Sequence, residues 1–109
     1  MFKLITPQTD NQLKKYYHFR WQMLREPWQM PNGSERDEFD VMSYHRMIVD
    51  GRGRPMAIGR LYVTPDNEGQ IRFMAVKSNR RSKGMGSFIL VALESFARQE
   101  GVKRLVCNA

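Results

Sequence analysis

Apolar residues recur with the helical period in two segments of the chain. The first segment opens at Thr9, whose spacing to Gln12 is that of a capping box. Its predicted apolar face comprises Leu13, Tyr16, Tyr17, Trp21 and Leu24. The second segment begins near Gly84 and ends at Gly101, because glycine is common just beyond a helix C-terminus. The pattern therefore predicts two amphipathic helices, one in each half of the chain.

Short apolar runs around these helices predict strands at residues 2–5, 46–50, 56–63, 71–76 and 103–107. A further short helix is predicted from Ser34 to about Ser43, since Ser34 and Asp37 look like a helix start with an acidic first turn. The resulting order, β-α-α-β-β-β-α-β, predicts an α+β (α/β) fold with a mixed, mostly antiparallel sheet flanked by helices. We expect residues 1–109 to form a single domain.

The charge of the chain narrows the choice of partner. The formal net charge is +7 over 109 residues. This excess suits an anionic partner, such as the phosphates of a cofactor, an acidic carrier protein or nucleic acid. The basic residues are dispersed along the sequence and have no adjacent aromatic stacking platform, which argues against nucleic acid.

The compartment is also constrained by the sequence. Cys107 is the only cysteine, so an internal disulfide is excluded and a reducing compartment is favoured. Residues 1–24 lack the continuous apolar core of a signal peptide, and no run approaches the ~18 apolar residues of a membrane span. We therefore expect a cytoplasmic protein with no membrane partner.

A basic turn with two glycines, Arg81-Ser82-Lys83-Gly84-Met85-Gly86, separates the apolar run 71–76 from the second helix. The first N–H groups of a helix lack partners and its dipole makes that end positive, so this turn suits a phosphate or pyrophosphate. Gly84 and Gly86 carry no Cβ and would let a ligand approach the backbone. The P-loop pattern is absent, and Ile89 stands where a dinucleotide fingerprint needs its third glycine. The alternative is a solvated turn with a basic rim.

The pattern Arg-x-x-Gly-x-Gly directly after an apolar strand resembles the pyrophosphate loop of the GNAT acetyltransferase family. The resemblance covers nearly the whole chain and is sharpest in residues 20–25, 33–37, 59–61, 71–76 and 94–104. These segments look like the N-terminal domain of a two-domain bacterial family, in which a GNAT domain precedes a thioesterase-like hotdog domain. That GNAT domain continues with a further helix and two strands, so we expect the chain to be truncated after its fifth strand.

The resemblance implies an acetyl-CoA-dependent N-acetyltransferase that acts on an amine and uses no metal. In the family, coenzyme A lies where two strands splay apart, and its pantetheine pairs like an extra strand. By resemblance, the backbone of residues 74–76 supplies this edge, with the Val76 N–H facing the thioester oxygen, and residues 81–87 wrap the pyrophosphate. The implied cofactor-binding residues are Met74, Ala75, Val76, Arg81, Ser82, Lys83, Gly84, Met85, Gly86 and Ser87.

The sequence does not reveal a clear general base. Histone-type members of the family carry a glutamate at the position that aligns with Gln70, and glutamine cannot accept a proton at neutral pH. Glu68, expected in the preceding turn, and Asn108, after the last strand, are the remaining candidates. The alternative interpretations are a solvated loop carboxylate, a surface amide, and a base that acts through water.

The acceptor amine is not identified by the sequence. Trp28 and Met30, in a loop bounded by prolines, are candidates for lining its pocket, and His45 either joins them with Asp40 or is simply hydrogen-bonded within the structure. Because Gln70 stands in place of the carboxylate and the family's further helix is missing, a second hypothesis is a module that binds acyl-CoA or an acyl carrier without transferring the acyl group. The uncovered sheet edge beyond residues 103–107 predicts self-association as a homodimer.

Overall fold

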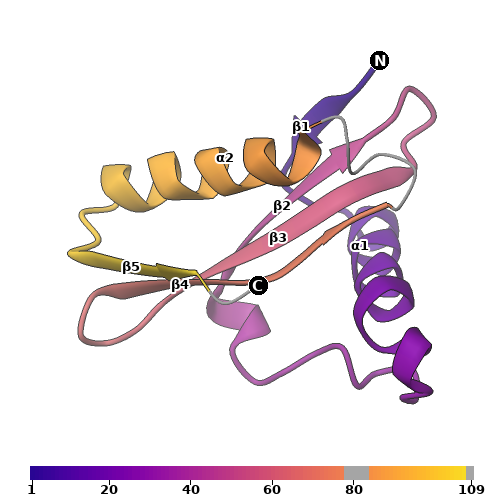
Figure 1. The fold of residues 1–109 in the computed structure, drawn as a ribbon, viewed down its shortest axis with the longest axis horizontal. Helices are drawn as coiled ribbons and strands as arrows, with labels where there is room; N and C mark the ends of the chain where they lie inside the picture. The colour runs from indigo at the N-terminus through magenta and orange to yellow at the C-terminus, as the bar shows by residue number, and fades with distance from the viewer. Residues whose placement is uncertain (78–83, 108–109) are drawn as a thin grey trace.

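The sheet that the sequence predicts is present, with one long helix on each face (Figure 1). The structure is a computed structural model that describes residues 1–77 and 84–107. Neighbouring strands pair antiparallel, except that β5 runs parallel to β4, which confirms the α+β class and the predicted meander. The strands lie in the order β1 (Lys3–Ile5), β2 (Tyr44–Val49), β3 (Pro55–Val63), β4 (Glu68–Val76) and β5 (Arg104–Cys107).

The helices α1 (Asp10–Leu24) and α2 (Met85–Gln99) pack on opposite faces of the sheet. Side chains alternate along β2, so Met47 joins the apolar cluster under α1 while Ile48 joins the cluster under α2. Both faces are thereby covered, which leaves strand edges and strand ends as places where a ligand can reach the main chain. The buried helix residues of the two clusters are Tyr16 and Phe19 on α1, and Met85, Ile89, Leu93 and Ala97 on α2.

The start of α1 and the end of α2 lie where the sequence predicts them. At the start of α1, Thr9 Oγ1 accepts from the Gln12 N–H at 3.1 Å, and Gln12 Oε1 accepts from the Thr9 N–H at 3.2 Å, which is a capping box. At the end of α2, Gly101 has a φ of 75° and the Val102 N–H donates to the Ala97 carbonyl at 3.1 Å. This Schellman arrangement satisfies a carbonyl that the helix leaves unpaired.

The connection from α1 to β2 is a long loop in place of the third predicted helix. It contains two single turns of 3-10 helix, η1 (Glu26–Trp28) and η2 (Asp40–Met42). The helix prediction was wrong because its polar signals serve other contacts. The Ser34 hydroxyl donates to a backbone carbonyl 2.6 Å away instead of capping a helix, and the carboxylates of Asp37 and Asp40 bind buried arginines. Among the described residues, no helix is long and apolar enough to cross a bilayer.

Candidate functional site

The second half of β4 has an open backbone edge. Within the described residues, strand β5 pairs with β4 from Glu68 to Ile71 and no further. From Arg72 to Val76, the side of β4 that faces away from β3 has no strand partner among residues 1–77 and 84–107; we call this segment the β4 edge. A free strand edge can bind an extended ligand through main-chain hydrogen bonds.

The direction of the N–H groups along the β4 edge follows from one hydrogen bond. The Lys77 N–H donates to the Met56 carbonyl on β3 at 2.8 Å. Successive N–H groups of a strand point to opposite sides, so the Val76 and Met74 N–H groups point away from β3, and that of Ala75 points toward it. Two of the three predicted edge residues therefore offer donors to a ligand.

An open pocket of about 290 Å³ runs along this edge. Its lining is Met23 and Leu24, from the end of α1, and Met74, Ala75 and Val76 of β4. These side chains are apolar, so the main chain supplies the polar contacts. A ligand held here would pair with the backbone and pack its own apolar groups against α1.

The start of α2 lies beside the end of β4. Gly84 is the N-cap residue, with φ 74° and ψ 16°, and no side chain of the described residues caps the helix by a hydrogen bond. A Cβ added at Gly86 would lie 3.4 Å from Val76 Cγ2, so the first turn of α2 adjoins the last residue of the β4 edge. The first N–H groups of a helix and the positive end of its dipole favour an anion at this position.

The other predicted binding residues contribute in different ways. Met85 is 5% exposed and packs in the core under α2, so only its main chain can contact a ligand. Ser87 is exposed. The predictions at Arg81, Ser82, Lys83 and Asn108 lie outside the described residues.

Glu68 lies at the far end of β4. It is the first residue of this strand and not part of the preceding turn, which corrects the sequence prediction. At the usual rise per strand residue, about 20 Å separate it from Met74. Its carboxylate lies 3.4 Å from Arg104 Nε and accepts from the Gln70 side chain at 3.3 Å. In the described part of the chain, no carboxylate lines the pocket along the β4 edge.

A buried cluster of charged residues was not predicted from the sequence. Arg20 on α1 and Arg60 on β3 are 0% and 1% exposed, and both donate to Asp40 Oδ1, at 2.9 and 3.0 Å. Asp37 accepts another bond from Arg60 at 2.6 Å. We call these four residues the arginine cluster. The sequence holds one signal for this cluster. Arg20 follows Tyr16 by four residues, so it lies on the same predicted apolar face of α1.

Tyr16 and His45 extend the arginine cluster. The Tyr16 hydroxyl lies 2.7 Å from His45 Nδ1, and His45 Nε2 lies 2.8 Å from the Asp40 carbonyl. Because a carbonyl only accepts, Nε2 carries the proton and Nδ1 accepts from the tyrosine. Burial lowers the pKa of His45 and raises the pKa of Tyr16, which favours the neutral form of both groups. His45 is thus hydrogen-bonded within the structure, whereas Trp28 and Met30 are 76% and 44% exposed.

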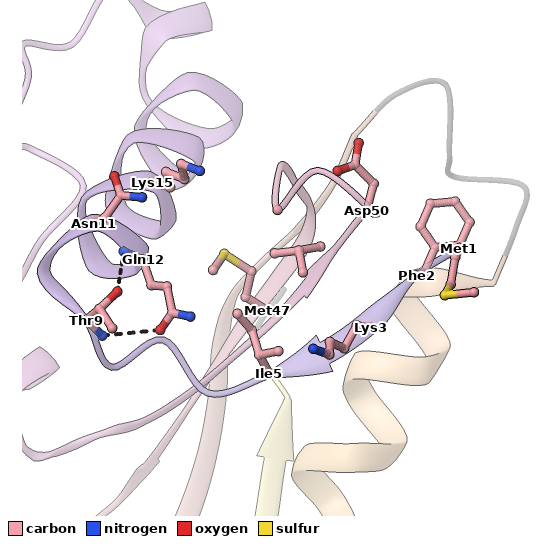
Figure 2. Close-up of a pocket in the computed structure, with 13 residues that line it drawn as sticks. Met1, Phe2, Lys3, Ile5, Thr9, Asn11, Gln12, Lys15, Met47 and Asp50 are labelled. Carbon is pink, nitrogen blue, oxygen red and sulfur yellow. Dashed lines mark hydrogen bonds between the residues drawn. The ribbon is translucent and has the colours of Figure 1, made fainter.

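A larger pocket, of about 620 Å³, lies between α1, β1 and the β2–β3 hairpin (Figure 2). Its floor includes Ile5 and Met47, which lie on the face of the paired strands β1 and β2. Two of its polar groups already have partners: Gln12 belongs to the capping box, and Asp50 accepts from Arg54 Nε at 2.7 Å. The start of α1 is thus capped by side chains, whereas Gly84 offers no side-chain cap at the start of α2. The β4 edge with the start of α2 is therefore the better candidate site.

The chemistry of the candidate site is that of main-chain donors. The N–H groups of the β4 edge can polarise a carbonyl, and the start of α2 can hold phosphate groups beside it. Among the described residues, no group of three or more His, Cys, Asp or Glu side chains is arranged to hold a metal ion. The site can thus bind and orient an extended anionic ligand with a carbonyl near one end.

The chain is similar to known proteins in sequence and in fold. The sequence profile of the acetyltransferase (GNAT) family matches residues 13–109. The Bacillus subtilis (strain 168) protein "Uncharacterized N-acetyltransferase YjcF" is 29% identical over 107 residues, which span 98% of this chain and 75% of that protein.

Two solved structures have the same fold. An acetyltransferase of the GNAT family from Staphylococcus aureus Mu50 aligns with 100% of this chain and 73% of its own, at a TM-score of 0.80 and 8% identity. Glucosamine-6-phosphate N-acetyltransferase from Arabidopsis thaliana aligns with 100% of this chain and 82% of its own, at 0.75 and 17%. At these identities the likeness concerns the fold alone.

Proposed function

The chain belongs to the acetyltransferase (GNAT) family, and we propose that it takes an acetyl group from acetyl-CoA, bound along the β4 edge, and transfers it to an amine. The family sets the class of the enzyme, an N-acyltransferase that uses an acyl-CoA. One observation supports the proposed site: the open edge of β4 adjoins the start of α2, so a thioester and a pyrophosphate of one ligand can be held together.

Each part of the site contacts a different part of acetyl-CoA. The Met74 and Val76 N–H groups pair with the pantetheine, and the Val76 N–H faces the thioester oxygen. Ala75, whose N–H is directed to β3, lines the pocket with its side chain. Residues 84–87 bind the pyrophosphate through their amides, together with Arg81, Ser82 and Lys83, which precede them in the sequence.

The reaction needs little side-chain chemistry. A neutral amine attacks the thioester carbonyl, so a C–N bond forms while the C–S bond breaks, and a main-chain N–H stabilises the negative charge that develops on the oxygen. The amine loses one proton to water, and the leaving thiolate takes up a proton. Holding the thioester in place lowers the entropic cost of the encounter. Gln70 cannot be a base, so we propose that water carries the amine proton.

The fold does not identify the amine that accepts the acetyl group. Two structures of the same fold are named glucosamine-6-phosphate N-acetyltransferase and ribosomal-protein-S18-alanine N-acetyltransferase, so one fold serves a sugar phosphate and a protein. Fold alone does not select an acceptor. Membership of an acetyltransferase family favours transfer over the second hypothesis, binding without transfer.

Isothermal titration with acetyl-CoA tests the proposed site, and Gly86→Ala is the informative variant. A methyl group at this position would stand where the pyrophosphate approaches the backbone, so we expect about tenfold weaker binding. Its Cβ would be only in ordinary contact with Val76, and alanine is the better helix former, so the free energy of unfolding should stay unchanged or rise by up to about 1 kcal/mol.

Gly51→Ala is the matched control, because a Cβ at Gly51 has no atom within 4 Å. It should bind acetyl-CoA like the wild type. Wild-type protein that does not bind acetyl-CoA would contradict the proposed site, as would a Gly86→Ala variant that binds it with unchanged affinity.

A further inference from the structure

Phe73 occupies an unusual backbone position just before the donors of the β4 edge. Its φ is 56°, in a region that bulky side chains rarely adopt. The pairing of β3 with β4 shifts register between Ile58 and Arg60, so two residues of β4, Phe73 and Met74, oppose Gly59. This is a β-bulge, which bends the strand and redirects the residues that follow. Something must hold it, because such a conformation costs energy.

The ring of Phe73 is held by guanidinium groups. The Cζ atoms of Arg20 and Arg60 lie over it at 4.4 and 4.5 Å from the ring centroid, and the ring residue itself is 9% exposed. Arg72 and Arg25 lie farther from the same centroid, at 5.1 and 5.7 Å. The Nε atoms of Arg20 and Arg60 are buried and have no hydrogen-bond partner among the described residues. Stacking on Phe73 thus adds to the ion pairs of both guanidinium groups, and buried cation–π contacts are the stronger ones.

Two positive groups on one ring would repel each other without a shared counter-charge. Asp40 supplies it, since one oxygen accepts from both arginines, at 2.9 and 3.0 Å. Asp37 holds Arg60 from the loop side at 2.6 Å. The arginine cluster therefore connects the α1–β2 loop, helix α1 and strand β3 to the bulge of β4.

We infer that Arg20 and Arg60 are positioning residues for the thioester: by clamping the Phe73 ring they fix the bulge that aims the Met74 and Val76 N–H groups at the open side of β4. The inference rests on the proposed function, because it concerns the same edge. It adds that this edge is set by charged side chains that themselves touch no ligand. If the arginine cluster only stabilised the fold, its disruption would weaken the binding of the pantetheine end and of the pyrophosphate end of the ligand alike.

Arg60→Lys tests this inference, because lysine keeps the charge for Asp37 and Asp40 but lacks the planar group that stacks on Phe73. Two ligands are titrated: acetyl-CoA, and the phosphoadenosine diphosphate portion of coenzyme A, which keeps the pyrophosphate and lacks the pantetheine. We expect about tenfold weaker binding of acetyl-CoA, the loss of roughly one good hydrogen bond. Binding of the nucleotide portion, which does not reach the β4 edge, should be unchanged.

Arg46→Lys is the matched control. Arg46 stacks over Phe96 at 4.8 Å, so it undergoes the same change on an aromatic ring of α2, on the face of the sheet opposite to α1 and the arginine cluster. It should bind both ligands like the wild type. Phe73→Leu is the second test variant, which keeps an apolar side chain and removes the ring between the arginines, and it decides the question if Arg60→Lys does not fold.

The outcomes are distinct. Weaker acetyl-CoA binding with unchanged nucleotide binding, in Arg60→Lys or in Phe73→Leu, supports the inference. Equal loss for both ligands, or no loss for either, overturns it and leaves the proposed function intact. Wild-type protein that binds neither ligand would instead overturn the proposed function.

Discussion

Asp40 is the residue at which the buried polar contacts converge. Its carboxylate accepts from Arg20 and Arg60, and from the Asp37 N–H at 2.8 Å. Burial alone would raise the pKa of Asp40, but the Arg20 charge and the hydrogen bonds outweigh burial and lower it overall. The carboxylate therefore stays ionised at neutral pH and neutralises the arginines. Because an unpaired buried charge is costly, this one residue ties the α1–β2 loop to the sheet.

His45 makes the stability of the fold depend on pH. Burial lowers its pKa in the folded state below the ordinary value of 6.5. Just below pH 6.5, the unfolded chain thus binds more protons than the folded chain, so the free energy of unfolding decreases as the pH falls. A His45→Gln variant, which keeps an N–H donor for the Asp40 carbonyl, should lose less stability than the wild type between about pH 7 and 5.

Urea denaturation at a series of pH values measures this difference. His18→Gln, at an exposed position on α1, is the control and should show the wild-type slope of stability against pH. If His45→Gln also keeps the wild-type slope, the imidazole is not the group that titrates.

The sequence predicts only part of the buried face of α1. The helical period correctly places Tyr16 on the buried face, where it is 0% exposed. Arg20 lies one turn later on the same face and is equally buried, although an arginine is by default assigned to solvent. Its partners come from the distant loop and from β3, and a local pattern holds no information about them.

At the scale of elements, strand β3 and helix α2 are in close contact at Gly59. A Cβ at this position would lie 2.6 Å from Ile89 Cγ2 and 3.0 Å from Leu93 Cδ1. We expect Gly59→Ala to lower the free energy of unfolding by about 1–3 kcal/mol, because the helix must move outward or the core side chains must leave their rotamers. Chemical denaturation measures the change.

A double-mutant cycle identifies the cause. Ile89→Ala removes the Cγ2 atom that the new methyl group would meet, so it should cost less in the Gly59→Ala background than in the wild type. Strictly additive effects would show that the steric conflict with Ile89 is not the reason for the loss.

Elements with local signals were predictable, and elements set by distant contacts were not. The capping box at Thr9 and the glycine at 101 fix the helix ends within a few residues, so the sequence shows both. The prediction of a helix near Ser34 was wrong because Asp37 and Asp40 form ion pairs with arginines more than fifteen residues away in the chain. The candidate site shows the same division. Residues 74–76 and the outward Val76 N–H were predicted from the resemblance, but the directions of the Met74 and Ala75 N–H groups required the strand register.

At the scale of the whole molecule, β5 is expected to cause self-association. Among residues 1–77 and 84–107, β5 pairs with β4 alone, which leaves the other side of Arg104–Cys107 without a strand partner. An uncovered strand edge can pair with another chain. The net charge of +7 opposes the approach of two copies, and salt screens this repulsion. We therefore expect a dimer that becomes tighter as the ionic strength rises, measured by sedimentation velocity with reductant present for the exposed Cys107.

A charge on the edge distinguishes strand pairing from other contacts. Val106→Lys should weaken the dimer, whereas Val91→Lys, the same change on the exposed face of α2, should do so only slightly through the added charge. A monomer at all protein and salt concentrations would contradict the prediction, and equal weakening by both variants would place the contact elsewhere. Pairing through the outer side of β5 leaves the β4 edge open, so saturating acetyl-CoA should not change the dissociation constant of the dimer.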